Sequence, residues 1–114
     1  MAFLNGIFSR RQAPSARELE KFVTALVGQC EAGAWQRVEG RTSWMSPDEA
    51  RGYIRARSAA VVHAQVQHAL RMRPNWPATT ATAVLEQTAN ETVRQIHRRL
   101  LNLRHPIVER RQAA

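Results

Sequence analysis

Residues 46–74 read SPDEARGYIRARSAAVVHAQVQHALRMRP, and they carry the clearest helix signals of the chain. The first four residues, Ser46 to Glu49, supply a capping serine, a proline suited to the first helical position and two carboxylates that face the positive end of the helix dipole. Pro74 cannot continue a helix because it lacks a backbone N–H. The stretch therefore predicts a helix over 46–73.

The apolar residues of this helix fall on two faces of a helical wheel. One face carries Ala50, Ile54, Val61, Ala64 and Met72, and the other carries Val62, Val66, Ala69 and Leu70. Two apolar faces are typical of a central helix with more than one neighbour. His68 projects near the first face, so we expect a partly buried histidine there rather than a metal ligand.

A second helix is predicted on the N-terminal side of this stretch. Ser15 and Glu18 have the spacing of a capping box. Apolar residues then recur at helical spacing until Gly40 supplies a C-terminal stop, which predicts a helix over 15–39. Its stripe contains Leu19, Phe22, Val23, Leu26, Val27, Cys30, Ala34 and Val38.

A third helix is predicted on the C-terminal side, over 79–104, and Pro106 follows its end. Its apolar stripe contains Leu85, Ala89, Thr92, Val93, Ile96, Leu100 and Leu103. Its opposite, largely polar side contains Val84, Gln87, Glu91, Arg94, Arg98 and Asn102.

Short connections between these helices favour antiparallel neighbours. No segment alternates between polar and apolar residues for long enough to predict a strand. A chain of 114 residues also has room for one domain only. We therefore predict an all-α fold, a small antiparallel bundle of three main helices preceded by a short amphipathic helix, with the helical domain over 15–105 and a frayed basic tail over 106–114.

The leader, residues 1–11 (MAFLNGIFSRR), combines apolar and basic residues in a short helical pattern. Its apolar side is formed by Phe3, Leu4, Ile7 and Phe8, followed by Arg10 and Arg11. Such a segment can enter the acyl boundary of a membrane while its arginines meet anionic headgroups. It resembles the membrane-targeting leader of the bacterial division-site factor MinE, over these residues alone, since the helical remainder departs from that family's strand-rich pattern. The resemblance implies membrane attachment, and docking of the leader onto the bundle is the alternative.

Composition indicates which partners and which cellular location to expect for the protein. The chain has 17 basic and 9 acidic residues, and its net charge of +8 predicts attraction to polyanions or anionic membranes. Cys30 is the single cysteine, so no disulfide can form within the chain. No apolar run is long enough to span a membrane and no secretory signal is present. We expect a cytoplasmic protein, with peripheral attachment at the inner face of a membrane as the alternative.

No pattern typical of catalysis or metal binding is present. The four histidines, at 63, 68, 97 and 105, lack metal-ligand spacing. Asp48 and Glu49 are explained by helix capping, and there is no glycine-rich phosphate loop or nucleophile motif. The sequence therefore predicts no catalytic residue, metal, cofactor or small-molecule substrate, and a protein that is not an enzyme.

Arginine carries the strongest functional signal. No acidic residue occurs between Glu49 and Glu86, and arginines continue into the third helix. The candidate polyanion-binding residues are Arg51, Arg55, Arg94, Arg98 and Arg99. A solvated helix face is the alternative interpretation. Because no nucleic-acid-binding motif is present, binding would be non-specific and sensitive to salt.

Tryptophan is the other candidate for recognition. Trp35, Trp44 and Trp76 fall in or near connections, where they can seal the ends of the core or form interface anchors. Taken together, these features lead us to expect a non-catalytic helical interaction or accessory module that binds another protein or itself. Non-specific nucleic-acid binding and peripheral membrane association through residues 3–11 are the alternatives.

Overall fold

The structure is a computed structural model that describes residues 13–104. It contains three α-helices, α2 (Ala16–Val38), α3 (Pro47–Arg71) and α4 (Ala78–Arg104). The predicted all-α bundle is thus confirmed, and each helix begins and ends within two residues of its predicted bounds. The amphipathic helix expected over 1–11 lies outside the described residues.

Local signals set these helix ends. The Ser15 hydroxyl accepts a hydrogen bond from the Glu18 backbone N–H at 3.1 Å and caps α2. At the start of α3, the Ser46 side chain and the Glu49 carboxylate each bond the other's backbone N–H, which completes a capping box. Gly40, with a φ of 74°, ends α2 in a conformation that favours glycine.

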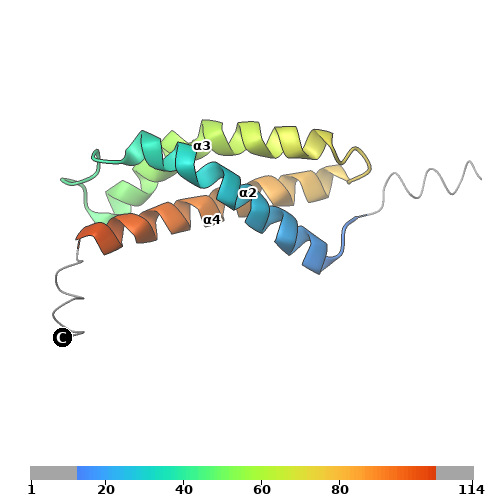
Figure 1. The fold of residues 1–114 in the computed structure, drawn as a ribbon, viewed down its shortest axis with the longest axis horizontal. Coiled ribbons are helices and arrows are strands. Elements are labelled where there is room, and N and C mark those ends of the chain that lie inside the picture. Colours follow the sequence, from blue (N-terminus) through green and yellow to red (C-terminus); the bar gives the residue numbers. More distant parts are fainter. Residues whose placement is uncertain (1–12, 105–114) are drawn as a thin grey trace, which may run out of the picture.

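The three helices pack against one another (Figure 1). α3 and α4 run antiparallel, and α2 crosses this pair obliquely. Two apolar clusters form the core. Cluster 1 contains Ala34, Trp35, Val38, Ile54, Val93, Ile96 and Leu100. Cluster 2 contains Leu26, Cys30, Val62, Val66 and Val84, with further half-buried residues around it.

A polar layer separates the two clusters. Ser58, Thr88 and Thr92 are all buried at this level. The Ser58 hydroxyl donates to the Ile54 carbonyl at 2.7 Å, one turn earlier in α3. Among the described residues the Thr88 hydroxyl has no hydrogen-bond partner, and the Thr92 hydroxyl has only a weak contact with the Cys30 thiol. Buried polar groups without strong partners cost stability, so the two threonine hydroxyls reduce the contribution of this layer to the core.

The structure confirms that α3 packs against two neighbours and corrects part of one of the two apolar faces expected on it. The face with Val62, Val66, Ala69 and Leu70 is buried or half-buried, whereas the other face is exposed at Ala64 and Met72. The buried residues of α3 form one row, with members four positions apart: Ala50, Ile54, Ser58, Val62 and Val66. Ala64 and His68 are exposed, and Met72 is 68% exposed at the C-cap. Rows of this spacing are the ridges through which helices pack, and each successive member is rotated about the helix axis. One rotating row therefore faces both α2 and α4.

The stripe predicted for α4 also needs correction. Val84 was expected on the polar side and is fully buried, whereas Leu103 was expected in the stripe and is 59% exposed. The buried row again advances by four residues, through Val84, Thr88, Thr92, Ile96 and Leu100. A row that rotates along the helix includes Val84 at one end and leaves Leu103 outside at the other.

Candidate functional site

Charge is distributed unevenly along the bundle. The two apolar clusters divide the described residues into one half around cluster 1, residues 32–58 and 90–104, and another around cluster 2, residues 13–31 and 59–89. The first, which we call the basic half, has nine basic residues (Arg37, Arg41, Arg51, Arg55, Arg57, Arg94, Arg98, Arg99, Arg104) and four acidic residues (Glu39, Asp48, Glu49, Glu91). The second, the balanced half, has four of each (Arg17, Lys21, Arg71, Arg73; Glu18, Glu20, Glu31, Glu86).

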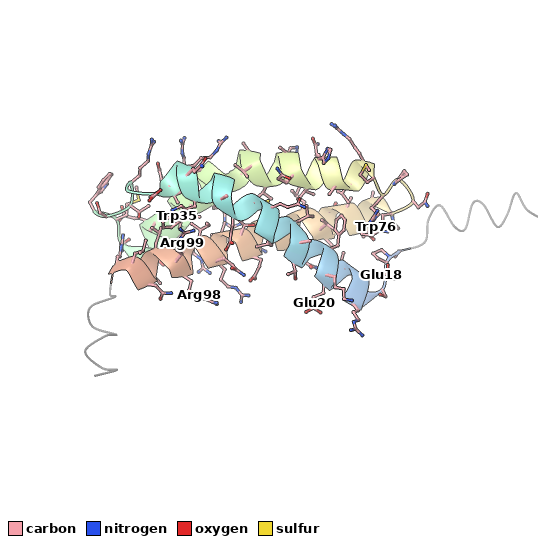
Figure 2. All side chains as sticks on the ribbon, viewed as in Figure 1. Glu18, Glu20, Trp35, Trp76, Arg98 and Arg99 are labelled. Carbon is pink, nitrogen blue, oxygen red and sulfur yellow. The ribbon has the colours of Figure 1, made fainter. Side chains whose placement is uncertain are left out.

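The antiparallel arrangement creates this difference. It brings the C-terminal parts of α2 and α4 to the N-terminal part of α3, and arginines occur in all three segments. Figure 2 shows Arg98 and Arg99 at the end of the bundle that holds Trp35, and Glu18 and Glu20 toward the other end. The excess of positive charge therefore occupies one end of the molecule.

Several arginines of the basic half have structural contacts. The Arg104 guanidinium donates to the carbonyls of Thr42 and Met45, and so ties the loop between α2 and α3 to the end of α4. The Arg99 guanidinium lies over the Trp35 ring, with its carbon 3.9 Å from the ring centroid, which is a cation–π contact. These contacts stabilise the fold and hold positive charge at this end.

The remaining arginines are largely unneutralised. The one salt bridge among the described residues joins Arg94 to Glu91 at 2.6 Å. The Arg94 hydrogen bond is also the main reason that the pKa of the Glu91 carboxyl lies below its usual value. Arg51 and Arg98 are exposed and make no hydrogen bond or ion pair with another described residue. The charge of Arg98 helps to lower the pKa of Glu91, but neither Arg51 nor Arg98 is held in an ion pair, so both can contact an anion.

The helix register places the predicted polyanion residues relative to one another. Arg55 of α3 donates to the Asn90 side chain of α4 at 3.1 Å. Because α3 and α4 are antiparallel, Arg51, one turn before Arg55, lies at the level of Arg94, one turn after Asn90. Arg98 follows a further turn along α4. Arg99, by contrast, turns toward α2 and Trp35 (Figure 2).

All five predicted polyanion residues thus lie in the basic half, and four of them line neighbouring parts of α3 and α4. The sequence-based prediction omitted four further arginines of this half, namely Arg37, Arg41, Arg57 and Arg104. The sequence feature that could have indicated some of these arginines is the short connection between α2 and α3. It returns the chain on itself and so brings the end of one helix beside the start of the next.

The three tryptophans occupy different environments. Trp35 is buried in cluster 1, with 7% of its surface exposed. Trp76 is half-buried and makes an edge-on contact with Phe22, with ring centroids 4.7 Å apart. Trp44 lies in the loop between α2 and α3 and is 74% exposed. Of the three, Trp44 is the one that presents most of its ring to a partner.

A groove of about 830 Å³ lies between α2 and α4. Its floor includes Val23 and Val27, which are already buried and offer little apolar surface. Its lining has three carboxylates, Glu20, Glu31 and Glu91, against one arginine, Arg94, which is paired with Glu91, so its net charge is unfavourable for an anionic ligand. The groove is therefore a poorer candidate for polyanion binding than the basic half.

Residues 13–104 show no feature typical of a metal centre or a membrane span. No group of three or more potential metal-binding side chains is present in this part of the chain. None of its helices has both the length and the apolar character needed to cross a membrane. Cys30 is buried, and this burial raises the pKa of its thiol.

Comparison with protein-family models, curated proteins and solved structures found no match for this chain.

Proposed function

We propose that this protein is a non-catalytic helical module that binds polyanions, nucleic acid in particular, through its basic half. The observation that carries the proposal is the uneven charge distribution, with nine basic and four acidic residues around cluster 1 and four of each around cluster 2. Positive charge gathered at one end of a small protein attracts phosphates and releases their counterions.

The fold supports this proposal because it limits internal neutralisation. Asp48 and Glu49 lie in the first turn of α3, where the helix dipole and the capping box engage them. Glu91 is paired with Arg94. These carboxylates therefore leave Arg51 and Arg98 without an ion pair, and the helices fix the backbone positions from which the two exposed side chains can reach phosphates.

A matched pair of double variants tests the proposal. Arg51→Ala with Arg98→Ala removes two charges from the basic half, and Arg17→Ala with Arg71→Ala removes two from the balanced half. All four side chains are exposed on helices, so both variants should fold. Affinity for a labelled single-stranded oligonucleotide is measured by fluorescence anisotropy over a series of salt concentrations.

For the basic-half variant we expect weaker binding and a shallower salt dependence. The slope of log K against log salt should fall by about 1.4, since each phosphate contact on a single strand contributes about 0.7. The control variant should change the slope by less than half as much. Equal effects of the two variants, or no binding by the intact chain at low salt, would overturn the proposal. Binding to polyglutamate without binding to the oligonucleotide would also overturn the proposal, and would indicate an acidic protein partner instead.

A further inference from the structure

Trp44 is an exposed aromatic residue on a turn whose backbone is anchored at the basic end. Its loop makes a tight turn in which the Met45 backbone N–H donates to the Thr42 carbonyl at 3.0 Å. Arg104 donates to the carbonyls of both Thr42 and Met45, the residues on either side of the segment that carries Trp44. The backbone of the turn is therefore anchored to α4, while 74% of the Trp44 surface remains exposed.

Keeping an indole ring exposed in water forgoes the favourable burial of a large apolar surface. Trp35 and Trp76 find partners within the fold, in Arg99 and Phe22 respectively. Trp44 has no aromatic or cation–π partner among residues 13–104. Helix capping and core packing therefore do not account for its position.

We infer that Trp44 stacks on a nucleobase, so that the basic half binds single-stranded nucleic acid in preference to duplex. This inference rests on the proposed function and specifies its ligand. A ring next to positive charge matches a single strand, whose bases are free to stack while arginines contact the phosphates. In a duplex the faces of the bases are already stacked on one another, so the ring gains little there.

The surroundings of Trp44 favour a base over an apolar protein surface. Its neighbours in the sequence include the exposed Arg41, Ser43 and Ser46, while Thr42 is buried and Met45 half-buried, so no apolar patch surrounds it in the turn. The centre of a protein interface is usually a continuous apolar patch, in which charged residues are depleted. One exposed ring on a turn that the Arg104 guanidinium holds is instead suited to one planar base with its phosphate.

The test compares the intact chain with Trp44→Ala and Trp44→Phe on a single-stranded oligonucleotide and on the duplex of the same sequence. Trp44→Ala should weaken single-strand binding by about five-fold or more and change duplex binding by less than two-fold. Trp44→Phe should retain part of the affinity because phenylalanine can still stack. Tryptophan fluorescence of the intact chain should be quenched on single-strand binding, with this quenching lost in Trp44→Phe.

Met72→Ala is the matched control, since Met72 is a similarly exposed apolar side chain in the balanced half. It should leave both affinities unchanged. If the intact chain binds nucleic acid with strong salt dependence and Trp44→Ala has no effect, or lowers both affinities equally, the stacking inference fails and the proposed function stands. If the intact chain binds neither nucleic acid, both fail. Loss of binding to vesicles of anionic lipid in Trp44→Ala, with oligonucleotide binding intact, would overturn the inference in favour of a membrane surface.

Discussion

Replacing the buried threonines of α4 with valine should stabilise the protein. Thr88 and Thr92 are both fully buried; among residues 13–104 the Thr88 hydroxyl has no hydrogen-bond partner, and the Thr92 hydroxyl has only a weak contact with the Cys30 thiol. Valine has nearly the same shape, is β-branched like threonine and has a similar helix propensity. The main change is thus removal of a buried hydroxyl without a strong partner.

The structure predicts different gains at the two positions. An unsatisfied buried hydroxyl costs about 1–3 kcal/mol, so Thr88→Val should raise the free energy of unfolding by about 1–2 kcal/mol. The Thr92 hydroxyl faces the Cys30 thiol, where it favours the thiolate and partly offsets the effect of burial on the thiol pKa. Because a thiol is a weak hydrogen-bond partner, Thr92→Val should gain less, about 0–1 kcal/mol.

The assay is guanidinium denaturation followed by far-UV circular dichroism, with the dependence on denaturant expected to stay unchanged. A gain of 1 kcal/mol should also raise the melting temperature by roughly 4–8 °C for a domain of this size. Thr82→Val is the control, since Thr82 is exposed and its hydroxyl bonds the Ala78 carbonyl at 3.1 Å. A loss of 1 kcal/mol or more in Thr88→Val would refute the reasoning, because it would mean that the hydroxyl has a partner in solution.

Three further predictions concern packing and titration. Gly28→Ala and Gly52→Ala should each stabilise the protein by up to about 1 kcal/mol in thermal melts, since an added Cβ meets nothing within 4 Å. Gly33→Ala should gain less, because its Cβ would lie 3.3 Å from a Val61 methyl group. Equal gains at all three sites would contradict this prediction. Arg99→Ala should cost about 0.5–1 kcal/mol through loss of the contact with Trp35, and its neighbour Arg98→Ala, which has no aromatic partner, should cost clearly less. The raised pKa of the buried Cys30 thiol means that folding favours the protonated thiol, so its contribution to stability is complete below the pKa of the unfolded thiol and declines as pH rises above that pKa. Because the thiol is buried, thiol reagents should react with it only as fast as the chain opens. Rapid labelling of the native protein would contradict this burial.

The ends of the three helices could be predicted from sequence because they depend on contacts only a few residues apart. Ser15 and Ser46 each bond a backbone N–H three positions along the chain, and Gly40 supplies a backbone conformation that other residues rarely adopt. These signals do not depend on the rest of the fold. The same holds for the run of α3 that lacks acidic residues, which singled out Arg51 and Arg55.

The tertiary structure alone decided which side of each helix is buried and where the charges gather. Val84 is buried and Leu103 exposed because α4 packs through a row that rotates along the helix, and the direction of that rotation depends on how the neighbouring helices cross. Likewise, Trp44 and Trp35 are both tryptophans near a connection, yet one is exposed and the other lies in cluster 1. The burial of a side chain and the local excess of charge both depend on residues that are distant in the chain, so they are determined only when α2, α3 and α4 pack together.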